Sequence, residues 1–143
     1  MTRRSVLAKR IRPASRPTLS ELSFTVPMVP PSVNSYVRHS RGRHYRTKPA
    51  DDFSLLVKQA VAGRQVRADF YAVTVIILLG PKQRGDIDNF AKVVLDSLVQ
   101  CGAIDSDSRI TSLAMMKGRV PAAGNTSVEV RPHYPVTVQL ERA

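Results

Sequence analysis

The apolar stretch Phe70–Leu79 restricts the possible folds of this chain more than any other segment. It is rich in β-branched residues and is followed directly by Gly80-Pro81, so it predicts a strand. Both of its alternating faces are largely apolar, which predicts a central strand covered on each side, where one cover could be a second subunit. It is too short to span a bilayer, which takes about 20 residues.

One helix is predicted on each side of this strand in the sequence. Apolar residues recur at helical spacing within 48–64 and again within 87–101, and Gly102 is a plausible helix stop. Further strands are predicted at 22–27, 109–117 and 135–141, with 128–130 continuing or flanking a strand and 30–46 forming a loop or short hairpin. This order predicts an α+β domain with a small mixed β-sheet and two helices.

The 143 residues fit one domain with an N-terminal extension. Residues 1–20 hold six basic residues and no acid, which predicts a flexible basic arm ahead of a folded domain at 21–143. The arm either adds phosphate contacts or is a dispensable tail. The single cysteine, Cys101, lies on an apolar helix face and is expected to be a buried hydrophobe, which fits a reducing cytoplasmic setting.

Lysine and arginine outnumber the acids by 22 to 11, which favours a polyanionic partner. Nucleic acid is the first candidate and an anionic membrane surface the second, but no basic amphipathic helix stands out, so no membrane partner is expected. The segment 36–46 interleaves arginines with tyrosines, which suits a phosphate backbone and unstacked bases, although it could be a solvated loop. Its candidate DNA contacts are Arg38, Arg41, Arg43 and Arg46.

Acidic residues gather in one part of this basic chain. Asp86 and Asp88 stand at the start of the second helix, where either could act as its N-cap, and Lys92 follows one turn later. Asp105 and Asp107 follow the end of that helix. Carboxylates are the ligands that Mg²⁺ prefers, so the sequence predicts a divalent-metal site, with Lys82 and Arg84 close enough to bind phosphate.

Each of these residues also has a plainer explanation. Acids at a helix start are common as caps and as partners of the helix dipole. An Asp–Lys pair at i, i+4 is more often a surface ion pair, and two acids in a loop are more often turn formers. It is their coincidence in so basic a chain that favours the metal site.

Two blocks of this sequence resemble the RusA-type Holliday junction resolvases. The first is 30–34 continuing to 38–43, and the second is Asp86-x-Asp88-Asn89-x-x-Lys92 followed by Gly102 and the acidic turn ending at Asp107. The resemblance implies a RusA-like fold over about residues 20–141. It also implies an endonuclease that uses Mg²⁺, or Mn²⁺ as a substitute, and acts as a two-fold homodimer on four-way DNA junctions through paired symmetric nicks.

The resemblance also implies roles for individual residues. Asp86, Asp88 and Asp107 match the catalytic, metal-binding acids, and Lys92 matches the essential lysine. Supporting roles fall to Asn34, Asn89 and Asp105. The chain departs from the family at Ser106, where an acid is usual, so Asp105 could replace Asp107 as the third ligand.

These matches predict hydrolysis of a DNA phosphodiester that releases a 5′-phosphate. A bound metal would activate water, while the Lys92 ammonium would stabilise the charge that develops on the phosphate. Two rival functions remain. One is a catalytically silent dimer that binds branched DNA. This function remains an alternative because a serine stands at 106, where the family usually has an acid. The other is a metal-dependent transferase for a nucleotide-linked substrate, which would not need so wide a positive surface.

Overall fold

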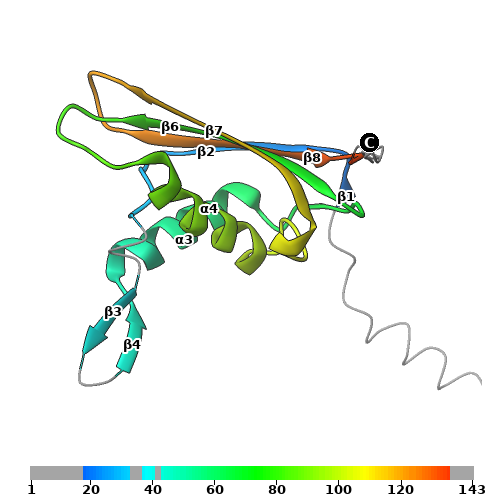
Figure 1. The fold of residues 1–143 in the computed structure, drawn as a ribbon, viewed down its shortest axis with the longest axis horizontal. Coiled ribbons are helices and arrows are strands. Elements are labelled where there is room, and N and C mark those ends of the chain that lie inside the picture. The colour runs from blue at the N-terminus through cyan, green and yellow to red at the C-terminus, as the bar shows by residue number, and fades with distance from the viewer. Residues whose placement is uncertain (1–17, 33–36, 41–42, 136–143) are drawn as a thin grey trace, which may run out of the picture.

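The computed structural model describes residues 18–32, 37–40 and 43–135 of the chain (Figure 1). Eight strands, two α-helices and one 3₁₀ helix lie in these ranges. In chain order they are β1 Thr18–Leu19, β2 Leu22–Val26, β3 Val37–Ser40, β4 Arg43–Arg46, α3 Lys48–Val61, β5 Gln65–Val66, β6 Tyr71–Leu79, α4 Ile87–Gln100, η1 Asp107–Arg109, β7 Ile110–Arg119 and β8 Asn125–Pro132.

The main sheet has four strands in the order β2-β8-β6-β7. It is mixed, because β6 and β7 run parallel while β8 is antiparallel to both β6 and β2. Helix α4 joins the two parallel strands, and it lies with α3 on one face of the sheet (Figure 1). The prediction of an α+β domain with a small mixed sheet and two helices is therefore confirmed.

The core lies between this sheet and the two helices. Val73, Val75 and Ile77 of β6 are at most 1% exposed, and they face the helices. The helices add their predicted apolar stripes, since Phe53 in α3 and Phe90 in α4 are almost fully buried. The two helices pack on each other as well as on the sheet, so the start of α4 is fixed against the end of β6.

The second predicted cover of β6 is not provided by the described chain, so cover by a second subunit stays a prediction. The strand is central, as expected, because it lies between β8 and β7. However, no described element covers the face formed by Thr74, Ile76 and Leu78, since both helices lie on the other side (Figure 1). Ile76 is 38% exposed and its partner in β7, Met116, is 49% exposed. The apolar pattern on this face therefore belongs to a surface of the described chain.

The remaining elements agree in part with the predictions. The hairpin alternative for 30–46 is confirmed by the antiparallel pair β3–β4. The segment at 128–130 is the middle of the longer strand β8, and the strand predicted at 109–117 continues as β7 to Arg119. The strand predicted at 135–141 lies almost wholly outside the described residues. The division at residue 20 remains a prediction, since the description begins at β1.

The ends of the helices follow from the local sequence. Helix α3 begins with Lys48-Pro49, whose proline suits the first turn, and ends where Ala62 adopts a left-handed conformation. Helix α4 ends before Gly102, whose φ of 79° confirms the predicted stop. Cys101 is partly buried against the core, and its thiol donates to the carbonyl of Leu98 at 3.5 Å. No helix in the described ranges has the length and apolarity needed to cross a membrane.

Candidate active site

The first two predicted site residues flank the start of α4. Asp86 is in the N-cap position, but its carboxylate accepts no capping hydrogen bond, so the predicted capping role is wrong for this side chain. Asp88 lies in the first turn. Both side chains are exposed and have no hydrogen-bond or ion-pair partner in the part of the chain that the structure describes. Two free carboxylates therefore stand at the positive end of the helix dipole, which favours their charge.

The other residues predicted on this helix lie next to these carboxylates. Lys92 is one turn further along and makes an ion pair with Asp96, with 3.5 Å between nitrogen and oxygen. Its ammonium is mostly exposed, so it remains able to meet a ligand. The backbone N–H of Asn89 donates to the carbonyl of Asp86 at 3.1 Å and so closes the first turn.

Two basic residues that the sequence analysis missed hold the loop ahead of α4. Arg119 donates from Nη1 to the carbonyls of Gly80 and Gln83, at 3.0 and 3.1 Å. Lys117 donates from Nζ to the carbonyl of Gly85 at 2.9 Å. Because these residues alternate along β7, they share one face. The predicted strand ended at 117, so their position at the end of β7 beside Asp86 was not recognised.

The predicted DNA contacts fall into two groups. Lys82 and Arg84 are exposed in the loop between β6 and α4, close in sequence to Asp86. Arg38, Arg43 and Arg46 belong to the β3–β4 hairpin, which lies toward the same end of the long axis as the start of α4 (Figure 1). Arg41 and Asn34 lie outside the described residues. Basic residues thus precede the carboxylate pair in the loop, and the hairpin lies toward the same end of the domain as this pair.

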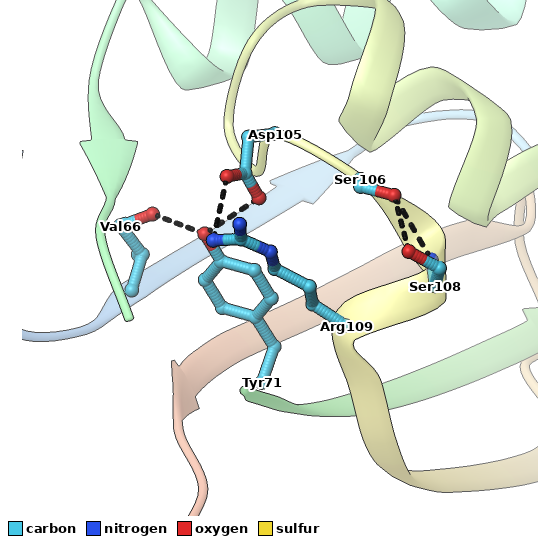
Figure 2. A network of polar contacts seen from close by, with 6 residues as sticks. All are labelled: Val66, Tyr71, Asp105, Ser106, Ser108 and Arg109. Carbon is cyan, nitrogen blue, oxygen red and sulfur yellow. Dashed lines mark hydrogen bonds and ion pairs between the residues drawn. The ribbon is translucent and has the colours of Figure 1, made fainter. Parts of the chain in front are cut away.

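The acids after α4 lie in a second polar network (Figure 2). Asp105 accepts a hydrogen bond from the Tyr71 hydroxyl at 3.1 Å and makes an ion pair with Arg109 at 3.0 Å. Ser106 caps η1, because its Oγ accepts from the backbone N–H of Ser108 at 3.2 Å. Asp107 opens η1 and is exposed, with no partner in the described chain. Asp105 is therefore engaged in the fold, whereas Asp107 is free.

Tyr71 anchors this network from the buried first position of β6. Its hydroxyl also lies 3.1 Å from the carbonyl oxygen of Val66. Burial raises the pKa of Tyr71 above its ordinary value of 10.0, and the negative charge of Asp105 and the hydrogen bond to it raise the pKa further. The hydroxyl consequently stays protonated, and able to donate, at neutral pH.

Replacing Tyr71 with phenylalanine should lower the free energy of unfolding by about 1–2 kcal/mol, because the carbonyl of Val66 and the Asp105 carboxylate lose a donor. The folded protein holds the Tyr71 proton more tightly than the unfolded chain. The stability that this adds is therefore complete below pH 10.0 and is lost as the pH rises through the raised pKa. Urea unfolding of both proteins should show a constant difference in unfolding free energy below pH 10.0, and this difference should narrow at higher pH. A difference that is absent at neutral pH would contradict the role given to the hydroxyl.

The two sets of acids lie at opposite ends of the domain. Asp105 contacts Tyr71 at the start of β6, whereas Gly85 contacts Lys117 near the end of the parallel strand β7. A strand as long as β6, nine residues, spans about 26 Å between its ends. Among the described residues, no three Asp, Glu, His or Cys side chains lie close enough to hold a metal ion. One chain therefore brings Asp86 and Asp88 together but leaves Asp107 apart from them.

Comparison with known proteins identifies the class of enzyme to which this arrangement belongs. A family model described as endodeoxyribonuclease RusA matches residues 27–131, which include both helices, strands β3 to β7 and nearly all of β8. The chain is a nuclease and belongs to the RusA family. A crossover junction endodeoxyribonuclease of Enterobacteria phage HK97 is 26% identical over 117 residues, covering 78% of this chain and 95% of that protein. Those of Escherichia coli K12 and Shigella sonnei are 24% identical over 116 residues, with the same coverage.

Proposed function

We propose that this protein resolves four-way DNA junctions by metal-dependent hydrolysis of phosphodiester bonds. The observation that carries the proposal is the pair of exposed carboxylates at the start of α4, which have no partner among the described residues, in a chain of the RusA family. The loop that leads to them carries Lys82 and Arg84, and its carbonyls are bound by Lys117 and Arg119. The relatives' names state that they act on crossover junctions, which makes a branched DNA the substrate to test first.

The residues present fit a Mg²⁺ ion, with Mn²⁺ as a substitute. Mg²⁺ is commonly bound by one or two carboxylates, with water and phosphate oxygens filling the remaining positions. Asp86 and Asp88 offer such oxygens with no competing protein contact in the described chain. The ion would supply an activated water and neutralise charge on the phosphate. Lys92, one turn along the same helix, would place its ammonium against the phosphate and stabilise the charge that develops there.

A homodimer would complete this site. In this dimer a two-fold axis would cross β7 near its middle, at right angles to the strand. The β7 strands of the two subunits would then run in opposite directions. The end of one subunit that carries Asp107 is then brought toward the end of the other that carries Asp86 and Asp88. Strand β7 suits this contact, because it is an edge strand and its Leu113 and Met116 are 43% and 49% exposed. We assign the third ligand to the partner subunit's Asp107, since Asp105 is engaged with Tyr71 and Arg109.

Two such sites related by the axis would produce paired, symmetric nicks. The serine at 106 does not oppose this function, because it caps η1 and so fixes Asp107. A reducing cytoplasmic setting is part of the same proposal, and a chain with a single cysteine needs no internal disulfide to fold.

The function is tested with a labelled four-way junction and a linear duplex of matched sequence, each incubated with Mg²⁺, with Mn²⁺ or with EDTA. The expected result is paired nicks on the junction alone, which disappear in EDTA. Tight binding of the junction without cleavage in either metal would overturn the nuclease and leave the silent branched-DNA-binding dimer in its place.

Replacing Arg119 with methionine should slow junction cleavage about tenfold or more, because the loop that positions Asp86 loses two hydrogen bonds. The concentration of Mg²⁺ needed for half-maximal rate should rise as well. Arg131, which is exposed on β8 and makes only a long ion pair of 3.8 Å, provides the matched control. Equal cleavage by Arg119→Met and Arg131→Met at every Mg²⁺ concentration would remove Arg119 from a positioning role.

A further inference from the structure

A cleft in the described part of the chain lies away from the carboxylate pair. It has a volume of about 930 Å³ and opens where β6 begins and β8 ends, beside the segment that carries Asp107. Its walls include Phe70, Tyr134, Arg67 and the Asp105–Arg109 pair. Pockets of roughly 300–1,000 Å³ are the size that takes a small organic group, so the cleft has room for a nucleotide.

Two aromatic side chains border this cleft and are exposed to solvent. Phe70 is 41% exposed and Tyr134 is 87% exposed. Large aromatic groups are normally withdrawn from water, and Tyr134 makes no hydrogen bond in the described chain. Exposed aromatic rings are the platforms on which proteins stack unpaired bases, since every base offers a flat π-face.

The charges around the cleft suit a phosphate. Arg109 is neutralised by Asp105, and the ring of His133 is held by the Thr111 hydroxyl at 2.6 Å. Arg67 is exposed and has no partner in the described residues, so its guanidinium is free to bind an anion, although the carboxylate of Asp69 lies in the same lining.

The described chain begins beside the same cleft. Strand β1 pairs with β5 through Thr18 and Gln65, and Gln65 lines the cleft. Six basic residues precede Thr18 in the sequence.

We propose that this cleft binds one unpaired nucleotide of the DNA substrate. The base lies against Phe70 and Tyr134, and its phosphate is bound by Arg67. Base pairs can open where the strands of a four-way junction exchange, so the cleft would let the protein favour an opened branch point over continuous duplex. The inference rests on the proposed function, because it takes DNA as the ligand and places the cleft next to the residue assigned to the metal site.

The test is binding in EDTA, measured by fluorescence anisotropy with a labelled single-stranded oligothymidylate and a labelled duplex of equal length. The full chain is compared with Tyr134→Ala, Arg67→Ala and the control Lys58→Ala, which removes an exposed cation from α3. Tyr134 is so exposed that its truncation leaves the core intact. Stacking energies predict that Tyr134→Ala weakens single-strand binding about tenfold. Duplex binding should change less than about twofold, as expected for a site that takes no paired base.

An oligonucleotide carrying 5-iododeoxyuridine adds a direct readout, since its photocrosslink should map to Phe70 or Tyr134. The proposal is overturned if Tyr134→Ala loses the same affinity for the single strand and for the duplex. It is also overturned if Tyr134→Ala loses no affinity and the crosslink maps to other residues. The two proposals fail separately. If Tyr134→Ala selectively loses affinity for the single strand but the wild type cleaves no junction, nucleotide binding in the cleft stands and the nuclease function is rejected. If the wild type cleaves the junction but Tyr134→Ala shows no selective loss of affinity, only nucleotide binding in the cleft is rejected.

Discussion

Replacing Asp88 with asparagine should abolish cleavage of a four-way junction while leaving the fold and DNA binding intact. The change removes one charged ligand from the proposed metal site, which corresponds to several kcal/mol of transition-state stabilisation and to a loss of roughly 10³-fold in rate. Asp88 is exposed and has no partner in the described chain, so the free energy of unfolding should change by less than about 1 kcal/mol. Junction affinity should stay equal or increase, because a negative charge facing phosphate is removed.

Asp52→Asn is the matched control for this experiment. Asp52 is also an exposed acid near the start of a helix, but it makes an ion pair with Lys48 at 3.0 Å and belongs to α3, not to α4 or the loop ahead of it. Cleavage by the Asp52 variant should equal that of the wild type. If Asp88→Asn instead loses both its fold and its junction binding, Asp88 is a structural residue of the helix start, and the proposed metal site is rejected.

Replacing Gly85 with alanine should damage both stability and cleavage. A Cβ at this position would overlap the ring of Phe90, which is 2% exposed and packed in the core beneath the start of α4. The ring cannot withdraw without opening that packing, so the variant should lose about 1–3 kcal/mol or more of unfolding free energy. Because Gly85 directly precedes Asp86, the displaced loop should also slow cleavage by at least about tenfold.

Gly63→Ala separates this packing effect from a general sensitivity to glycine substitution. Gly63 has a φ of 74°, so alanine there is strained, but a Cβ would meet nothing within 4 Å. A cost of about 1 kcal/mol with unchanged cleavage is expected. Thermal unfolding and junction cleavage of both variants give the comparison. Equal effects from the two substitutions would show that the contact between Gly85 and Phe90 does not position the acids.

Local sequence patterns predicted most of the helices and strands. The apolar stretch at 70–79 and the helical spacing at 87–101 gave β6 and α4 nearly at their observed ends, because the residues that form these elements also bury them. The same pattern predicted a second cover for β6, which the described chain does not provide. Apolar alternation tells which face avoids water but not whether a helix of the same chain or a second subunit provides the contact. The full length of β8 was missed because its ends, Asn125 and Pro132, are residue types that usually mark loops and turns.

The site was predictable in part. The spacing of Asp86, Asp88 and Lys92 along one helix is a local property, and the structure places them together. Spacing placed Asp107 after the helix but could not show whether the following loop folds back toward Asp86, because that depends on the parallel pairing of β7 with β6. Nor could it show that Arg119 reaches back across 36 residues to the carbonyl of Gln83. Contacts of that kind are set by strand pairing.

We propose that each active site combines Asp86 and Asp88 of one subunit with the partner subunit's Asp107. Mixed dimers of Asp88→Asn and Asp107→Asn, carrying different affinity tags and purified through both, test this arrangement. Each variant alone should be inactive. In the mixed dimer, one site loses ligands from both subunits while the other keeps all of them, so we expect Mg²⁺-dependent single nicks on the junction. A mixed dimer that binds the junction but makes no nick would contradict it and place all three acids within one chain.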